Sequence, residues 1–361
     1  MNRSDYLVDA DITRAHTLSS DFYTNPQIFA LIKEQLFARS WQCIGLTTDL
    51  TEAESVQPFF FMPDFLDEPL LLSRDQNNQL HCLSNVCTHR GNIIAESGGH
   101  CSELRCRYHG RRFDLEGKVK SMPQFKDAQD LSGQDNHLPE TPLNHFGPLL
   151  FTSLNPAFSF EDWIKPVAER LSWIPFQDFQ HTPEYAQTYE IDAHWALYID
   201  NYLERFHIPF IHPELNHQLH DPELTYELFD YGSLQLEIAK PGELTFQIPD
   251  SYPDSGKAIS AYYFWLFPNI MMNVYPWGLS LNLVFPVSAS KTQIRCETFI
   301  WKEELFSPEA IDSMHAMEIE DTAILELVQK GMGARLYKQG RYSPKMEVAV
   351  HHFHRLIGNY L

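Results

Sequence analysis

The sequence has no apolar run long enough to cross a membrane. A transmembrane helix needs roughly 20 consecutive apolar residues. The most apolar stretch of this 361-residue chain, 262–272, is interrupted by Pro268 and Asn269. The first residues also lack the apolar core of a secretory signal. We therefore expect a cytoplasmic protein with no membrane partner.

Positive charge is scarce as well. The chain has 27 Lys and Arg against 48 Asp and Glu, a formal net charge of -21. Because nucleic acids and anionic lipid surfaces are bound through basic patches, this balance argues against a nucleic-acid partner. The six cysteines are scattered rather than arranged as a paired framework, which is typical of a reducing compartment.

The patterns that are present predict an α+β fold with two domains. Residues 1–40 include a helical pattern that opens at Pro26, and we expect this segment to pack on the second domain. Residues 41–155 contain short apolar runs separated by Gly, Pro, Asn and Asp, which predict a small all-β domain. Residues 156–361 form the larger domain, where β-branched and aromatic residues over 234–298 predict an antiparallel sheet.

Two patterns predict helices that flank this sheet. Ser159 and Asp162 have the spacing of a capping box, which predicts a helix that continues to Leu171. Ser307-Pro308 begins a long helical pattern that Gly331 is placed to end.

The small domain carries two short clips of metal-binding residues. Cys87-Thr88-His89 is followed, after sixteen residues, by Cys106-Arg107-Tyr108-His109. Such a set fits a [2Fe–2S] cluster in which two thiolates hold one iron and two imidazoles hold the other. A structural zinc site uses the same ligand types, but zinc fingers usually pair Cys with Cys and His with His in the sequence. Here each clip mixes the two types, and we favour the cluster.

These clips resemble the Rieske domain of ring-hydroxylating and related oxygenases. The resemblance rests on Cys87-Thr-His89-Arg-Gly and on Cys106-Arg-Tyr-His109-Gly. It implies that Cys87, His89, Cys106 and His109 bind a Rieske-type [2Fe–2S] cluster.

A second constellation lies in the larger domain. Two histidines and one carboxylate on one face bind Fe(II) in non-haem oxygenases. His207 and His212 are five residues apart and would diverge by roughly 140° on a regular helix, so we expect Pro209 to bend the chain between them. Glu204 lies one turn before His207, and we expect it on the same helical face. His217 and His220 are competing candidates, because 212 to 217 repeats the same spacing.

The pattern Asn201-x-x-Glu204-x-x-His207-x4-His212 resembles the iron motif of the α (catalytic) subunits of Rieske non-haem iron oxygenases. The resemblance implies a catalytic domain of the helix-grip type over 156–361. It also implies a third ligand, a carboxylate on a C-terminal helix. Helical periodicity barely separates Asp321 from Glu320 there; the family's acid-then-Asp pattern favours Asp321, with Glu320 as the alternative.

The resemblance also implies how such a chain is supplied with electrons. They would pass from NAD(P)H through a separate ferredoxin or flavin reductase to the cluster, and then to a mononuclear Fe(II) that uses O2. Three chains would form a head-to-tail ring. Glu204 would bridge a cluster histidine, His89 or His109, to an iron histidine of the neighbouring chain.

The substrate is indicated less directly. Most members of the family have Asp at the bridge, and Glu204 resembles the subgroup of choline and carnitine monooxygenases. Aromatic residues over 262–277 would suit a trimethylammonium group through cation–π attraction, or they could simply form core. Our best interpretation is hydroxylation or N-demethylation of a quaternary ammonium compound. Aromatic-ring hydroxylation is the alternative, and a non-catalytic Rieske electron carrier or a zinc-stapled binding protein are alternatives of other classes.

One segment departs from the acidic character of the chain. Residues 89–120 carry seven Arg and Lys against four Asp and Glu, a balance of 7 − 4 = +3. Such a basic island beside the cluster could receive an acidic reductase, or its arginines could bond to the cluster loops.

Overall fold

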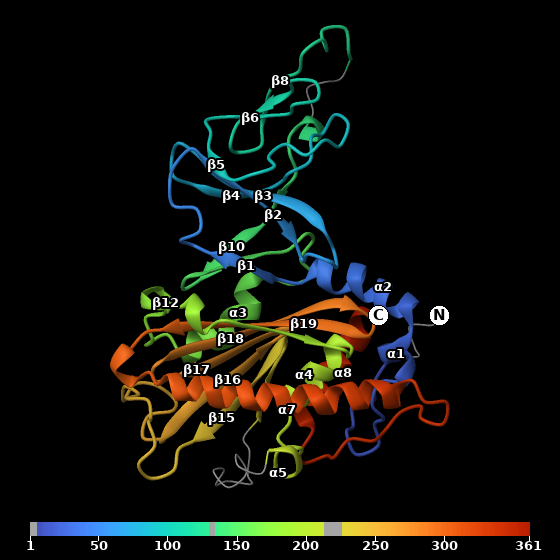
Figure 1. Cartoon of the computed structure of the whole chain (residues 1–361), viewed down its shortest axis with the longest axis vertical. Helices are drawn as coiled ribbons and strands as arrows, with labels where there is room; N and C mark the ends of the chain where they lie inside the picture. The colour runs from blue at the N-terminus through green and yellow to red at the C-terminus, as the bar shows by residue number, and fades with distance from the viewer. Residues whose placement is uncertain (1–5, 130–133, 213–225) are drawn as a thin grey trace. The chain divides into compact units, whose positions relative to one another are not determined.

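The computed structural model describes residues 6–129, 134–212 and 226–361. The chain divides into two compact units, Trp41–Ala157 and a second that combines Met1–Ser40 with Phe158–Leu361 (Figure 1).

The unit of residues 41–157 is built from short antiparallel strands. One sheet has the order β5-β2-β3-β4-β9, a second β6-β7-β8 and a third β1-β11-β10. The strands are β1 (Gln42–Leu46), β2 (Ser55–Phe61), β3 (Glu68–Arg74), β4 (Leu80–Ser84), β5 (Gly99–His100), β6 (Leu104–Arg105), β7 (Arg112–Phe113), β8 (Val119–Ser121), β9 (Glu140–Thr141), β10 (Leu143–Phe146) and β11 (Leu149–Thr152). Its core contains Leu71, Leu83 and Phe113, together with the side chains of Cys87 and Cys106.

The other unit is centred on one large antiparallel sheet. Its order is β12-β19-β18-β17-β16-β15-β14, and β13 also pairs with β19. The strands are β12 (Gln180–His181), β13 (Gln187–Ile191), β14 (Tyr226–Phe229), β15 (Gly232–Ile238), β16 (Ile259–Leu266), β17 (Ile270–Tyr275), β18 (Gly278–Ser288) and β19 (Lys291–Ile300). The predicted antiparallel sheet over 234–298 is therefore confirmed.

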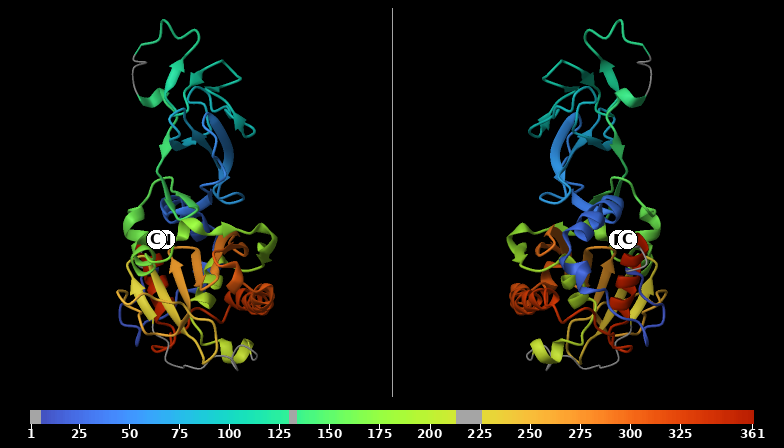
Figure 2. Two further views of the ribbon diagram at one scale, coloured as in Figure 1. Left: turned by 90° about the vertical axis from the view of Figure 1, so that its left-hand side faces the viewer. Right: turned by 90° about the vertical axis from the view of Figure 1, so that its right-hand side faces the viewer.

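Helices surround this sheet (Figure 2). They are α1 (Ser20–Thr24), α2 (Pro26–Gln35), α3 (Phe160–Arg170), α4 (Trp195–Tyr202), α5 (Ile208–Ile211), α7 (Pro308–Met332) and α8 (Val348–Tyr360). Ser159 accepts from the amide of Asp162, as the capping pattern predicts, and the Asn25 side chain accepts from the amide of Gln27. The predicted end of the long helix at Gly331 is wrong, because α7 continues to Met332. Helix α7 runs across the large sheet in Figure 1, and α4 contacts both α7 and strand β18.

This arrangement is the α+β fold expected from the sequence, with a small all-β unit and a larger unit of antiparallel sheet and helices. Among the described helices, none combines the length and the hydropathy that a membrane crossing demands.

Candidate metal centres and active site

Cys87 and Cys106 open two loops of matching geometry in the small unit. In each loop the cysteine carbonyl accepts from the glycine four residues later, Gly91 or Gly110, at 3.0 Å. Both glycines have positive φ, 69° and 73°, which a residue with a side chain rarely adopts. Two tight turns of the same kind therefore present the two clips.

The folded loops sort the four side chains by type. The thiols of Cys87 and Cys106 interact with each other, and the rings of His89 and His109 lie 4.6 Å apart, centroid to centroid. The four donor atoms are not gathered around one point: no three of them lie within 4.8 Å of one another. Among the described residues, only a group in the other unit is packed that closely. A thiol pair beside an imidazole pair suits a two-iron cluster better than a single tetrahedral zinc ion.

The environment of the thiols favours one thiolate. Burial raises the pKa of Cys87. Burial also raises the pKa of Cys106, but the amides of Tyr108 and His109 donate to its sulfur and outweigh burial, so its pKa lies below the usual value.

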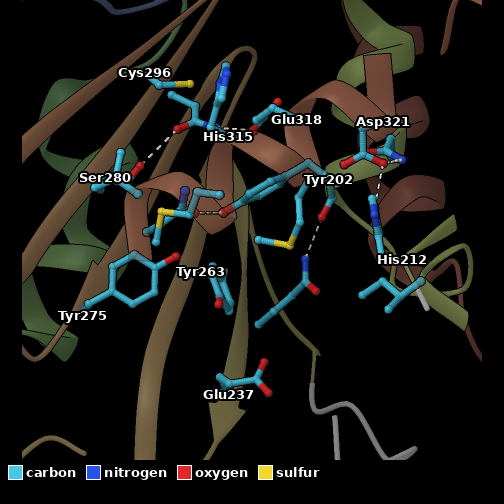
Figure 3. A pocket seen from close by; sticks show the side chains of 18 of the residues that line it. Tyr202, His212, Glu237, Tyr263, Tyr275, Ser280, Cys296, His315, Glu318 and Asp321 are labelled. Carbon is cyan, nitrogen blue, oxygen red and sulfur yellow. Dashed lines mark hydrogen bonds and ion pairs between the residues drawn. The ribbon is translucent and has the colours of Figure 1, made fainter. Parts of the chain in front are cut away.

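The second group consists of His207, His212 and Asp321. One donor atom from each lies within 4.8 Å of the others. Oδ1 of Asp321 is 3.0 Å from Nε2 of His212 and 3.8 Å from Nε2 of His207. Figure 3 shows Asp321 and His212 pointing toward each other. Two imidazole nitrogens and one carboxylate on one face are the donor set that non-haem iron uses.

The chain positions the two histidines differently from the expectation. They flank the short helix α5: His207 is its N-cap and His212 its C-cap. Pro209 lies in the first turn of α5, where a missing amide proton costs nothing, so it starts this helix and does not bend a longer one. Because α4 ends at Tyr202, Glu204 lies in the connecting loop, and the predicted shared helical face is wrong.

Each histidine has a carboxylate on its other nitrogen. Nδ1 of His207 lies 2.5 Å from Oε1 of Glu204, and Nδ1 of His212 lies 2.6 Å from Oε2 of Glu320. Such partners fix the orientation of an imidazole and raise its basicity as a ligand. The sequence analysis predicted this role for Glu204 only.

Asp321 and Glu320 therefore face different sides of His212. Asp321 is held from α4, where the amide of Asn201 donates to its Oδ1 at 3.1 Å. Burial raises the pKa of Asp321, although His212 and His207 lower it. The competing candidates His217 and His220 lie outside the described residues.

A cavity of about 360 Å³ opens on this group (Figure 3). Tyrosines form much of its wall, from α4, β13, β16, β17 and the segment before β13; they are Tyr185, Tyr189, Tyr198, Tyr202, Tyr263 and Tyr275. Several acidic side chains join them, among them Glu237, Glu243 and Glu318.

The cavity separates the aromatic residues over 262–277 into two groups: only Tyr263 and Tyr275 line it, whereas Phe264 and Trp265 are completely buried core. The exposed His315 also lies on the wall, with Nδ1 2.7 Å from the hydroxyl of Tyr189. Tyr198 and Tyr202, one turn apart on α4, were missed, because only the folded chain shows which face of α4 meets the cavity.

The basic island of residues 89–120 is partly internal. Arg111 is buried and donates to the hydroxyl of Thr88 at 2.9 Å, so it supports the cluster loops. Lys118 is paired with Glu116. Arg90 and Arg105 are exposed and form no ion pair with any described residue.

A thiol and imidazole pair in a small β unit, and a His, His, Asp face in a helix-covered antiparallel sheet, define a Rieske non-haem iron oxygenase. Comparison with known families agrees: residues 40–140 match the Rieske [2Fe-2S] domain, and 179–361 match the catalytic domain of the ring-hydroxylating α subunit. The chain belongs to this family. It is an O2-dependent oxidoreductase whose cofactors are a [2Fe–2S] cluster and a mononuclear iron.

Two individual relatives and one solved structure are similar to nearly the whole of this chain. The chain is 28% identical to the chloroplastic choline monooxygenase of Arabidopsis thaliana, over 96% of this chain and 83% of that one. It is 27% identical to the carnitine monooxygenase oxygenase subunit of Escherichia coli, over 96% and 94%. A crystal structure of the quaternary ammonium Rieske monooxygenase CntA with an inhibitor matches its fold, with a TM-score of 0.76, 22% identity and coverage of 100% and 98%.

Proposed function

We propose that this enzyme oxidises a small quaternary ammonium compound at a carbon next to the nitrogen. The balanced reaction takes one C–H bond, O2, two electrons and two protons to a C–OH group and water; hydroxylation of an N-methyl group would then lead to demethylation. The observation that carries this proposal is the cavity itself, which is lined by tyrosines and acidic side chains beside the His207, His212 and Asp321 group. Relatives that act on choline and carnitine support it.

The charge and the rings of the cavity both suit a cation. Arg205 is the only Arg or Lys among the described residues that line it, and it is paired with Glu237. Tyrosine faces attract a trimethylammonium group by up to about 2 kcal/mol when water is excluded. Aromatic-ring hydroxylation is the second candidate, favoured by the family match. No Phe or Trp is among the described lining residues, however, and apolar rings are what an arene would require.

We assign the metal-binding residues as follows. Cys87, His89, Cys106 and His109 would hold the cluster, and His207, His212 and Asp321 would hold the iron. The cluster supplies single electrons and the iron supplies open positions for O2. Glu204 and Glu320 hold the two iron histidines by their Nδ1 atoms. Asn201 fixes the carboxylate of Asp321.

The assembly and the redox partner are also proposals. We infer a homotrimer in which Glu204, already bonded to His207, receives a cluster histidine of the neighbouring chain. Electrons would reach the cluster from NAD(P)H through a separate ferredoxin or flavin reductase. We place the protein in the cytoplasm, a location supported by six free cysteines.

The test is turnover of choline, glycine betaine, carnitine and simple aromatics with a surrogate reductase. Consumption of O2 coupled to oxidation of a quaternary ammonium compound supports the proposal, whereas product from aromatics alone contradicts it. Two variants test the ligands in the same preparations. Cys87→Ser should abolish the visible absorption of the cluster; His207→Ala should spare that absorption and lose the mononuclear iron.

A further inference from the structure

Glu318 is a half-buried carboxylate on the cavity wall, one turn before Asp321 on α7. The hydroxyl of Tyr198 donates to its two oxygens at 2.9 and 3.0 Å. The amide of Asn282 on β18 reaches Oε1 at 3.4 Å and the Tyr198 hydroxyl at 3.0 Å. Residues from two other elements therefore hold this carboxylate in one position (Figure 3).

Glu318 and Glu243 are the acidic side chains of the cavity wall that form no ion pair with a described residue, and of these two only Glu318 is half-buried. Glu204 is bonded to His207, Asp321 to His212, and Glu237 to Arg205. No described residue forms an ion pair with Glu318, and the nearby acid, Asp321, repels its negative form. Burial, the largest effect, raises its pKa to about 7. A buried carboxylate without a cation is costly to the fold.

The side chains that other elements present to Glu318 are neutral. Tyr198, Asn282 and the Cys296 thiol face it from α4, β18 and β19, and burial keeps the pKa of Tyr198 and of Cys296 well above the usual values. On its own helix, His315 is engaged with the hydroxyl of Tyr189. The surroundings of Glu318 thus offer one positioned carboxylate beside neutral side chains, and a cation that pairs with it would favour its ionised form against the raised pKa.

Resting on the proposed function, we infer that Glu318 is the residue that selects a positively charged substrate, by pairing with its ammonium group. Glu318 and Asp321 are three residues apart on α7, about 4.5 Å along the helix axis. A cation beside Glu318 therefore lies next to the face formed by His207, His212 and Asp321. In this position a carbon attached to the nitrogen is the nearest part of the substrate to that face. Glu318 would thus decide both the charge of the substrate and which of its carbons is presented.

The experiment compares each ammonium compound with an isostere of the same shape in which a neutral carbon takes the place of the positively charged nitrogen. Choline, glycine betaine and carnitine are each paired with the compound in which carbon replaces nitrogen: 3,3-dimethylbutan-1-ol, 3,3-dimethylbutanoate and 3-hydroxy-5,5-dimethylhexanoate. Dissociation constants are measured by anaerobic calorimetry on the holoenzyme. We expect the wild type to prefer at least one cation over its isostere by about 10-fold or more, and Glu318→Gln to reduce this preference to about 3-fold or less.

Three further variants make the result specific. Asp312→Asn removes the same charge from an exposed position on α7 and should keep the preference. Glu318→Asp keeps a carboxylate and should keep a preference above that of Glu318→Gln. Tyr198→Phe keeps the carboxylate of Glu318 but removes the hydroxyl that donates to it, so the preference should be intermediate. This variant replaces Glu318→Gln if Glu318→Gln does not fold.

The outcomes separate this inference from the proposed function. Equal preference in the wild type and in Glu318→Gln overturns the role of Glu318 and leaves a quaternary ammonium substrate in place. A similar weakening of cation and isostere also overturns it, because the residue would then only shape the wall. A wild type that binds no cation, or that binds the isosteres equally well, overturns both.

Discussion

The carboxylate of Glu320 lies 2.6 Å from Nδ1 of His212. This contact occupies the ring nitrogen that faces away from Asp321, so two consecutive residues of α7 hold the two nitrogens of one imidazole. The same arrangement on His207 uses Glu204. Both histidines of the candidate iron site are therefore fixed in orientation by a carboxylate on Nδ1.

The first prediction concerns Glu320. Glu320→Gln keeps the shape of the side chain but removes the charge that raises the basicity of His212. We expect the affinity for the mononuclear iron to fall by roughly 10- to 100-fold. The measurement is the iron retained after dialysis against a graded chelator. The visible spectrum of the cluster serves as an internal control and should be unchanged; iron retention equal to that of the wild type would refute the prediction.

The second prediction concerns Glu204, which we propose to connect two subunits. In Glu204→Gln we expect both metals to bind and the cluster to be reduced by the reductase, while little product is formed. The physical reason is that the amide cannot supply the negative charge that the two imidazoles share. Single-turnover assays of the pre-reduced protein measure this step directly. Wild-type product yield in the variant would rule out a bridging role.

The third prediction is a pH dependence of stability. Burial raises the pKa of Glu318 from 4.5 to about 7, so the native state holds this proton more tightly than the unfolded chain. The resulting stabilisation is complete below pH 4.5 and is lost as the pH rises through 7. Glu318→Gln does not titrate, so its advantage in free energy of unfolding over the wild type should be small at pH 5 and reach about 1–2 kcal/mol at pH 8.

Urea denaturation at the two pH values measures this difference. Asp312→Asn, exposed on the same helix, should show no such change between pH 5 and pH 8. If Glu318→Gln were less stable than the wild type at pH 8, the carboxylate would stabilise the fold. The statement that this unpaired carboxylate destabilises the protein would then be wrong.

The fourth prediction concerns the reductase. Arg90 and Arg105 are the exposed cations of the basic island that have no ion-pair partner among the described residues. We expect Arg90→Gln/Arg105→Gln to slow reduction of the cluster by an acidic partner by about 10-fold at low salt, with the difference shrinking as ionic strength rises. Stopped-flow reduction measures this rate.

Lys118→Gln is the matched control for that experiment, because Lys118 already pairs with Glu116 and contributes little net charge. Its rate should stay within about twofold of the wild type. A rate that is independent of salt and equal in all three proteins would leave the island with a structural role alone.

The candidate metal-binding residues could be selected from the sequence because their chemistry is expressed in residue type and short spacing. Cys87 and His89, or His207 and His212, are recognisable without any knowledge of the fold. Their local geometry was harder: Pro209 has the same sequence signal whether it bends a helix or starts one, and the end of α4 at Tyr202 decided the matter.

Contacts that join distant parts of the chain could not be predicted. Glu318 is held in position by hydrogen bonds from Tyr198 and Asn282, which belong to α4 and β18. Helical periodicity left Glu320 and Asp321 nearly equivalent, because a helix shows which residues lie toward a partner but not which nitrogen of that partner each one meets. One sequence cannot supply this pairing, since it depends on how the elements pack.

The two cysteines of the cluster clips belong to the hydrophobic core of their unit. Binding of a cluster by these thiols would therefore be coupled to formation of that core, and cofactor binding would contribute to the free energy of folding. In a cell short of iron, the unit of residues 41–157 would be the part of the chain open to proteolysis. The supply of iron would then determine the amount of intact enzyme as well as the fraction of it that is active.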